Sequence, residues 1–150
     1  MRMQLPKDFQ SQLKNVVPNY LNLKDAFVAS EVEQISSAAA NLQVELQSVE
    51  NQDLDGMVKS HFDMIQQKLK AITTSDSLEE QRAAFVILNE NMVVLVNNIS
   101  GIAPDLYLQR CPMANNNKGA VWLSSSSEIR NPYYGDAMLT CGSVIDTLGL

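Results

Sequence analysis

The chain is short of the residues from which most catalytic and metal sites are built. Its 150 residues include one histidine, one tryptophan and two cysteines. It has no glycine-rich phosphate loop and no Glu-x-x-His pairs of the kind that bind di-iron centres on helices. Structural zinc requires four cysteine or histidine ligands, and this chain has only three such residues. We therefore expect no enzyme activity, and we interpret the scattered carboxylates as solvated helix surfaces.

The chain also lacks long runs of positive charge and of apolar residues. Its net charge is −6 and it contains no run of lysine or arginine, which argues against nucleic acid or an anionic membrane as the partner. No apolar run approaches the roughly 20 residues that span a bilayer. The N-terminal sequence MRMQLPKDF lacks the apolar core of a secretory signal. This leaves open both a cytoplasmic location and a signal that was removed from a longer chain.

Apolar residues at helical spacing divide residues 1–104 into four helical segments. The second segment shows the pattern best, because its apolar residues recur at alternating steps of three and four and so form one buried stripe. The four stripes contain Leu13, Val16, Tyr20 and Phe27; Val32, Ile35, Ala39, Leu42, Leu46 and Val49; Val58, Phe62, Ile65, Leu69 and Ile72; and Phe85, Leu88, Met92, Leu95 and Ile99. Short polar links join them. The fold class is therefore mainly α, with an antiparallel four-helix bundle over residues 1–104.

Local signals mark where these helices begin and where one of them is disturbed. Ser30 with Glu33, and Ser77 with Glu80, have the spacing of capping boxes, in which each residue satisfies a free amide of the other. Pro18 lies inside the first helical segment and lacks an amide hydrogen. It therefore predicts a kink or a break there.

Residues 105–150 have a different composition and read as a β-loop appendage. The run from Leu106 to Arg110 alternates apolar and polar residues, and GAVWL at 119–123 is a second short β-prone run. The intervening PMANNNKG is rich in asparagine and closes with Gly119, which favours a turn. A segment of this kind cannot fold alone. We expect it to pack on the bundle, so that the whole chain forms one structural domain.

The tail also concentrates the sulfur of the chain. Cys111 is followed by Met113, and Met138 precedes Cys141 by three residues. One interpretation is a structural disulfide between Cys111 and Cys141, with no metal. A second is a metal site, because thiolate and thioether are soft ligands that select Cu(I) or Ag(I). A distant redox thiol pair ranks third, because no basic residue is placed to lower the pKa of a thiol.

His61, the single histidine of the chain, is a further candidate metal ligand. Met57 precedes it by four residues and Met64 follows it by three. At 100° per residue these three side chains fall within about 60° of one another, at the edge of the apolar stripe. A boundary histidine beside two space-filling methionines is one interpretation. The alternative hypothesis is that His61 faces the tail and gives a nitrogen ligand to the sulfur site.

A series of short motifs runs through the tail: Cys111-Pro112-Met113-Ala114, Gly119, Trp122-Leu123-Ser124, Glu128-Ile129, Asn131-Pro132-Tyr133, Gly135, Met138 and Cys141-Gly142. Together these motifs resemble the C-terminal signature of a bacterial cell-envelope domain family of unknown function. Members of that family occur alone in the envelope of Gram-negative bacteria, and also fused to periplasmic adaptor subunits of heavy-metal efflux pumps. The resemblance implies a periplasmic or envelope-anchored protein, but no reaction.

This setting favours the metal interpretation over the disulfide. It implies a Cu(I)- or Ag(I)-binding protein, a chaperone or accessory to an efflux system, whose ligands are Cys111, Met113, Met138 and Cys141, with His61 as a further candidate. Trp122 would shield the cation with its ring; its alternative role is to seal the tail onto the bundle. Partners would be the metal ion and an efflux-pump adaptor or another envelope protein. The competing function is a non-metal interaction module stapled by a Cys111–Cys141 disulfide.

Overall fold

The computed structural model describes residues 7–50, 56–98, 106–134 and 138–148. Four long helices occupy the first two ranges: α1 (Lys7–Val28), α2 (Val32–Glu50), α3 (Gly56–Thr73) and α4 (Leu78–Asn98). A small antiparallel sheet follows, so the chain is mainly helical, as predicted. The predicted boundary between residues 104 and 105 lies outside the described residues. No helix in the described ranges is both long enough and apolar enough to cross a bilayer.

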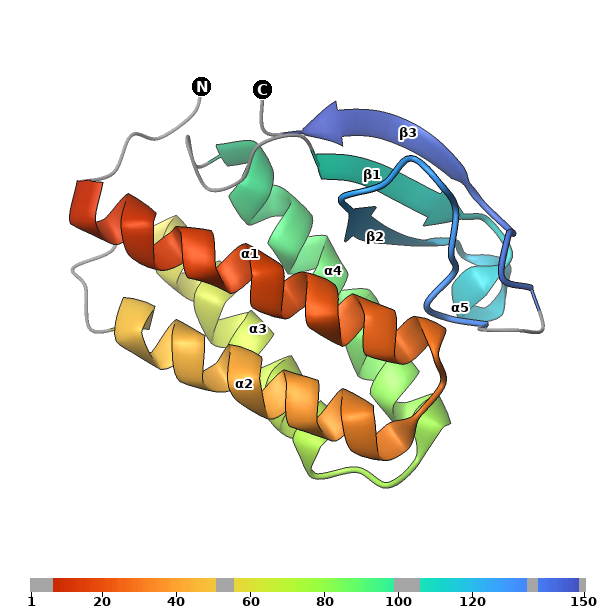
Figure 1. Ribbon diagram of the computed structural model, residues 1–150, viewed down its shortest axis with the longest axis horizontal. Coiled ribbons are helices and arrows are strands. Elements are labelled where there is room, and N and C mark those ends of the chain that lie inside the picture. The colour runs from red at the N-terminus through yellow and green to blue at the C-terminus, as the bar shows by residue number, and fades with distance from the viewer. Residues whose placement is uncertain (1–6, 51–55, 99–105, 135–137, 149–150) are drawn as a thin grey trace.

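The long helices pack against one another in chain order, α1 on α2, α2 on α3 and α3 on α4 (Figure 1). The predicted stripes supply the contacts, because their side chains within the described residues are buried, except for the half-buried Val32 at the start of α2. On α1 and α4 the core is aromatic, with the rings of Phe27 and Phe85 stacked 4.2 Å apart between centroids. This arrangement is compatible with the antiparallel bundle expected from the sequence.

The prediction that Pro18 could break the first helix is wrong. Pro18 lies inside α1, which continues to Val28. Its neighbours Val16, Val17 and Tyr20 are all buried in the core. Proline inside a helix costs about 3 kcal/mol, and burial of each large apolar side chain returns about 1.5–3 kcal/mol. Packing of these neighbours therefore outweighs the local preference of proline.

Of the two predicted capping boxes, the structure forms one in modified form. The Ser77 hydroxyl accepts the N–H of Glu80 at 3.3 Å, while the Glu80 carboxylate accepts from the Ser75 hydroxyl at 2.8 Å. Ser30 is not a cap, because α2 begins two residues later and Ser30 has a positive φ of 59°. Its hydroxyl instead accepts from the Arg82 guanidinium at 2.8 Å. A tertiary contact to α4 has replaced the local one.

The tail forms a three-stranded antiparallel sheet that packs on the helices along one edge (Figure 1). β1 (Leu106–Cys111) is central, between β2 (Ala120–Ser124) and β3 (Ser143–Leu148). β2 is the strand that contacts α4 and α1. The two predicted strands are confirmed, with Gln109 opposite Trp122. β3 is absent from the prediction, because only its last residue, Leu148, is buried and no alternating pattern results.

The asparagine-rich turn between β1 and β2 is confirmed, and its conformation is unusual. It contains a single helical turn, α5 (Ala114–Asn117), in which Asn115, Asn116 and Asn117 have positive φ values of 56°, 56° and 67°. Asparagine tolerates this left-handed region better than most residues do. Gly119 closes the turn at φ 88°, and a Cβ there would lie 2.1 Å from the Arg110 guanidinium. The three asparagines and the glycine thus fold the chain back for β2.

Candidate functional site

The two cysteines meet at one end of the sheet. Cys111 is the last residue of β1 and is fully buried, whereas Cys141 lies two residues before β3 and is half-buried. Arg110 pairs with Ser143, so the antiparallel ladder brings the two cysteine-bearing segments together. The two Sγ atoms are 2.9 Å apart, and both residues are free cysteines. Residues separated by 30 positions therefore form one dithiol pair.

A glycine next to Cys141 makes this approach possible. Gly142 has φ +139°, a conformation that L side chains rarely adopt. A Cβ on Gly142 would lie 2.9 Å from the backbone oxygen of Arg110 and 3.1 Å from Cη2 of Trp122. Any side chain here would push the Cys141 segment away from β1. The close approach of the two segments therefore explains why glycine directly follows Cys141.

The surroundings of Cys141 do not favour its thiolate form. The hydrogen bond to Cys111 raises the pKa of the Cys141 thiol, with further contributions from burial and from the charge of Cys111. Catalytic thiols are activated by a lowered pKa, which is the opposite shift. Two thiols at this distance can, once deprotonated, ligate a soft ion together, or they can be oxidised to a disulfide.

Asn131 holds the Cys141 segment in place. Its side-chain amide donates to the Cys141 carbonyl at 2.9 Å, and its backbone N–H donates to the Leu139 carbonyl at 2.7 Å. Its side-chain oxygen accepts the Tyr133 N–H at 2.8 Å. Asn131 is fully buried. These bonds fix the backbone of Cys141 from one side, independently of the thiol.

The two candidate methionines flank the cysteines on these two segments. Met113 follows Cys111 by two residues and is 45% exposed, and its carbonyl accepts the Tyr134 hydroxyl at 2.6 Å. Met138 is half-buried, and its carbonyl accepts the Cys141 N–H at 3.0 Å, which closes a tight turn. Both residues therefore have ordered backbones beside the dithiol pair.

Trp122 lies behind the pair, within the core. It is fully buried, its indole N–H donates to the Gln109 side-chain oxygen at 2.7 Å, and its ring meets Tyr133 edge-on at 6.0 Å between centroids. Its Cη2 atom is the part of the ring that reaches toward Gly142. Trp122 thus packs in the core next to Gly142, the residue that follows Cys141.

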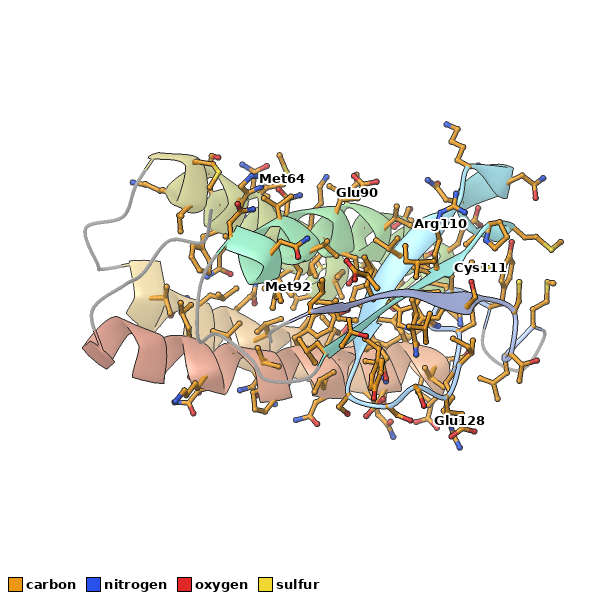
Figure 2. The ribbon with its side chains drawn as sticks, turned by 90° about the horizontal axis from the view of Figure 1, so that it is seen from above. Met64, Glu90, Met92, Arg110, Cys111 and Glu128 are labelled. Atoms are coloured by element: carbon orange, nitrogen blue, oxygen red, sulfur yellow. The ribbon has the colours of Figure 1, made fainter. Side chains whose placement is uncertain are left out.

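The structure does not bring His61 to the cysteines. His61 lies on α3, where its Nδ1 is 2.7 Å from the side-chain oxygen of Asn91 on α4. Figure 2 shows Met64, one helical turn further along α3, well separated from Cys111 at the end of β1. Among the described residues no group of three or more histidine, cysteine, aspartate or glutamate side chains is arranged to hold a metal. A metal at the cysteine pair would need methionine sulfur or another donor.

Comparison with known proteins identifies the family through the helices. The model of a family described as a protein of unknown function, DUF3347, matches residues 16–102. That match spans more than half of the chain. The chain belongs to the DUF3347 family. No curated protein and no solved structure matches it.

The DUF3347 match covers most of the four long helices and ends before β1. Cys111, Met113, Met138 and Cys141 thus lie outside the matched range. The chemistry of their side chains identified these residues from the sequence. No sequence pattern identified Asn131 as the residue whose hydrogen bonds hold the Cys141 segment, a role for which we call it a clamp. Its only signal was its position in the Asn-Pro-Tyr sequence, because its partners Leu139 and Cys141 are eight and ten residues away.

Proposed function

We propose that this protein binds a soft monovalent ion, Cu(I) or Ag(I), through Cys111 and Cys141, with Met113 and Met138 as supporting ligands. The observation that carries the proposal is the 2.9 Å separation of the two Sγ atoms across the end of the sheet. Thiolate and thioether donors together select soft ions and suit Mg²⁺ or Ca²⁺ poorly. The four long helices, taken as an antiparallel bundle, form the scaffold.

Binding requires only a small movement of the pair. Metal–thiolate bonds of about 2.3 Å place two sulfurs roughly 3.8 Å apart around a tetrahedral ion. The Sγ atoms at 2.9 Å would therefore separate by about 1 Å. Cys111 is held in the β1 ladder, so we assign the movement to the half-buried Cys141. The buried Trp122 would exclude water from the inner side.

The cellular role that we propose rests on the tail motif, and it involves no catalysed reaction. Its resemblance to envelope domains supports a periplasmic or envelope-anchored location, with the protein acting as a chaperone, sink or accessory to a heavy-metal efflux system. An efflux-pump adaptor or another envelope protein is the proposed partner.

The same sulfur distance supports a second function. A disulfide has a bond of about 2.05 Å, so closing the pair by about 0.9 Å would staple the tail without a metal. A loop of about 30 residues would then stabilise the fold by about 3.6 kcal/mol on the chain-entropy model. In this case the protein is an interaction module, and its helices dock on a partner.

Anaerobic titration of the reduced protein with Cu(I) against a competing chelator tests the proposal. We expect about one equivalent to bind tightly enough to compete with the chelator, the Cys111→Ser/Cys141→Ser variant to lose this tight binding, and the Met113→Leu/Met138→Leu variant to bind more weakly. Affinity that is unchanged in the double serine variant would refute the proposal. Thiol counting on protein purified without reductant separates the two functions: no free thiols, and no metal bound until reduction, would favour the staple.

A further inference from the structure

The contact between His61 and Asn91 fixes the imidazole in one protonation pattern. The Asn91 side-chain amide nitrogen donates to the Ile87 carbonyl at 2.8 Å, so its oxygen is the atom that faces His61. That oxygen lies 2.7 Å from Nδ1 and can only accept a hydrogen bond. Nδ1 must therefore carry the proton. In the neutral imidazole the lone pair is then on Nε2.

Metal-binding histidines show the same arrangement. Their second ring nitrogen almost always donates to an oxygen acceptor, which orients the ring and fixes the tautomer. Here Asn91 has that role, and it is itself held by the backbone of α4. The half-buried His61 is therefore a preoriented nitrogen donor.

Two thioethers share the face of α3 that carries this histidine. Met57 precedes His61 by four residues and Met64 follows it by three, and α3 is helical throughout Gly56–Thr73. Residues at these spacings are neighbours on a helix surface. Met57 is 41% exposed and Met64 is half-buried. One nitrogen and two soft sulfur donors thus lie along one partly exposed strip.

We propose that Met57, His61 and Met64 form a second soft-metal site, for Cu(I) or Ag(I), separate from the cysteine pair. Neutral imidazole and thioether both suit these ions. All three ligands are uncharged, so the bound ion keeps its positive charge and binds more weakly than it would between two thiolates. Such a site would exchange its ion readily. The proposal does not depend on the cysteine site.

Ag(I) titration followed by NMR tests this site, because Ag(I) is diamagnetic and redox-inactive. The protein is labelled at the methionine methyl carbons and histidine ring nitrogens, in the Cys111→Ser/Cys141→Ser background. We expect the methyl signals of Met57 and Met64 to shift together with Nε2 of His61. The signal of Met92, which is buried in α4, is the internal control and should stay fixed. Far-UV circular dichroism checks the fold, and alanine replaces serine if the variant unfolds.

Two further variants separate ligation from packing. His61→Ala should abolish the Met57 and Met64 shifts. Asn91→Ala should weaken Ag(I) binding by about tenfold to a hundredfold, the usual effect of losing such an orienting partner, while Asn91→Asp should restore it. The proposal is overturned if the methyl signals do not move, or if they move equally in His61→Ala. If the wild-type protein does not bind Cu(I) at its cysteines but the signals of Met57, His61 and Met64 still shift with Ag(I), the proposed function is refuted and the second site stands.

Discussion

The hydroxyl oxygen of Tyr20 on α1 accepts the backbone N–H of Leu123 on β2 at 2.9 Å, across 103 positions of sequence. The same hydroxyl donates to the side-chain oxygen of Asn89 on α4. The Asn89 amide donates to the Tyr133 hydroxyl at 2.8 Å, which donates to the Val121 carbonyl at 2.6 Å. Three side chains thus satisfy two backbone groups on the outer side of an edge strand. The edge strand can therefore lie against the helices, in the core that they share, without leaving these two backbone groups unpaired.

Asn89→Ala should lower the free energy of unfolding by about 2–4 kcal/mol, because it removes the acceptor of Tyr20 and the donor to Tyr133 within the core. Asn98→Ala on the same helix is the matched control. Within the described residues, its amide donates to the Val94 carbonyl alone, one turn earlier on α4, so its effect should stay within about 0.5 kcal/mol. Urea denaturation monitored by circular dichroism compares the two. Equal effects would show that the Tyr–Asn–Tyr network contributes little.

The stability should fall at high pH through the same two tyrosines. Burial raises the pKa of Tyr20 and of Tyr133 well above the ordinary value. The stabilisation is fully present below the unfolded pKa of about 10. It is lost as the pH rises from there toward the folded pKa values, because the unfolded chain releases protons first. Each tyrosine contributes a slope of up to about 1.4 kcal/mol per pH unit.

Tyr133→Phe isolates this effect, because every other ionisable group is common to the variant and the wild type. The free energy of unfolding should fall less steeply with pH in the variant, by up to about 1.4 kcal/mol per unit. Urea denaturation at several pH values between about 9 and 11 measures both slopes. Parallel curves for wild type and variant would mean that Tyr133 ionises as easily in the folded protein as in the unfolded chain.

The helices were predictable because their signals are local. The spacing of the apolar residues predicted all four long helices, and Ser77 marked the beginning of α4. The errors occur where distant residues override such signals. Ser30 satisfies Arg82 and not its own helix, and packing around Pro18 keeps α1 whole. β3 could not be found, since a strand with five exposed residues has no buried face to read.

The candidate site divides in the same way. Residue chemistry identified Cys111 and Cys141, and the structure brings their Sγ atoms to 2.9 Å. The position of His61 depends on its partner 30 residues away, Asn91, which no spacing rule could name. Asn131 is a clamp only because the chain folds back on itself between it and Cys141. Local sequence patterns thus identify candidate ligands, whereas tertiary contacts decide which of these ligands lie close together.

Asn131→Asp should weaken Cu(I) binding at the cysteine pair by about tenfold with a smaller loss of stability than Asn131→Ala. Aspartate keeps an acceptor for the Tyr133 N–H but loses the donor to the Cys141 carbonyl. Loss of such an orienting contact commonly costs 10–100-fold in metal affinity. Chelator competition and urea denaturation give the two quantities. Unaltered affinity in both variants would show that the clamp serves the fold alone.

Gly142→Ala should both destabilise the protein and separate the cysteines. At φ +139° an alanine is strained, and its Cβ would meet the Arg110 carbonyl oxygen at 2.9 Å. That oxygen belongs to β1 and cannot move without breaking the ladder, so the Cys141 segment must move. We expect a loss of about 2 kcal/mol or more. We also expect slower closure of the disulfide under a controlled oxidant, because the thiolate attack requires contact between the sulfurs.

Gly56→Ala is the matched substitution, since a Cβ at Gly56 meets no atom within 4 Å and the residue begins α3. Alanine is the better helix former, so this variant should be as stable as wild type or slightly more stable, with unchanged thiol oxidation. If both alanine variants behave alike in unfolding and in oxidation rate, the close approach at Gly142 does not set the position of Cys141. The position of Cys141 would then depend on Asn131 and on the pairing of β1 with β3, and Asn131→Ala should slow oxidation where Gly142→Ala does not.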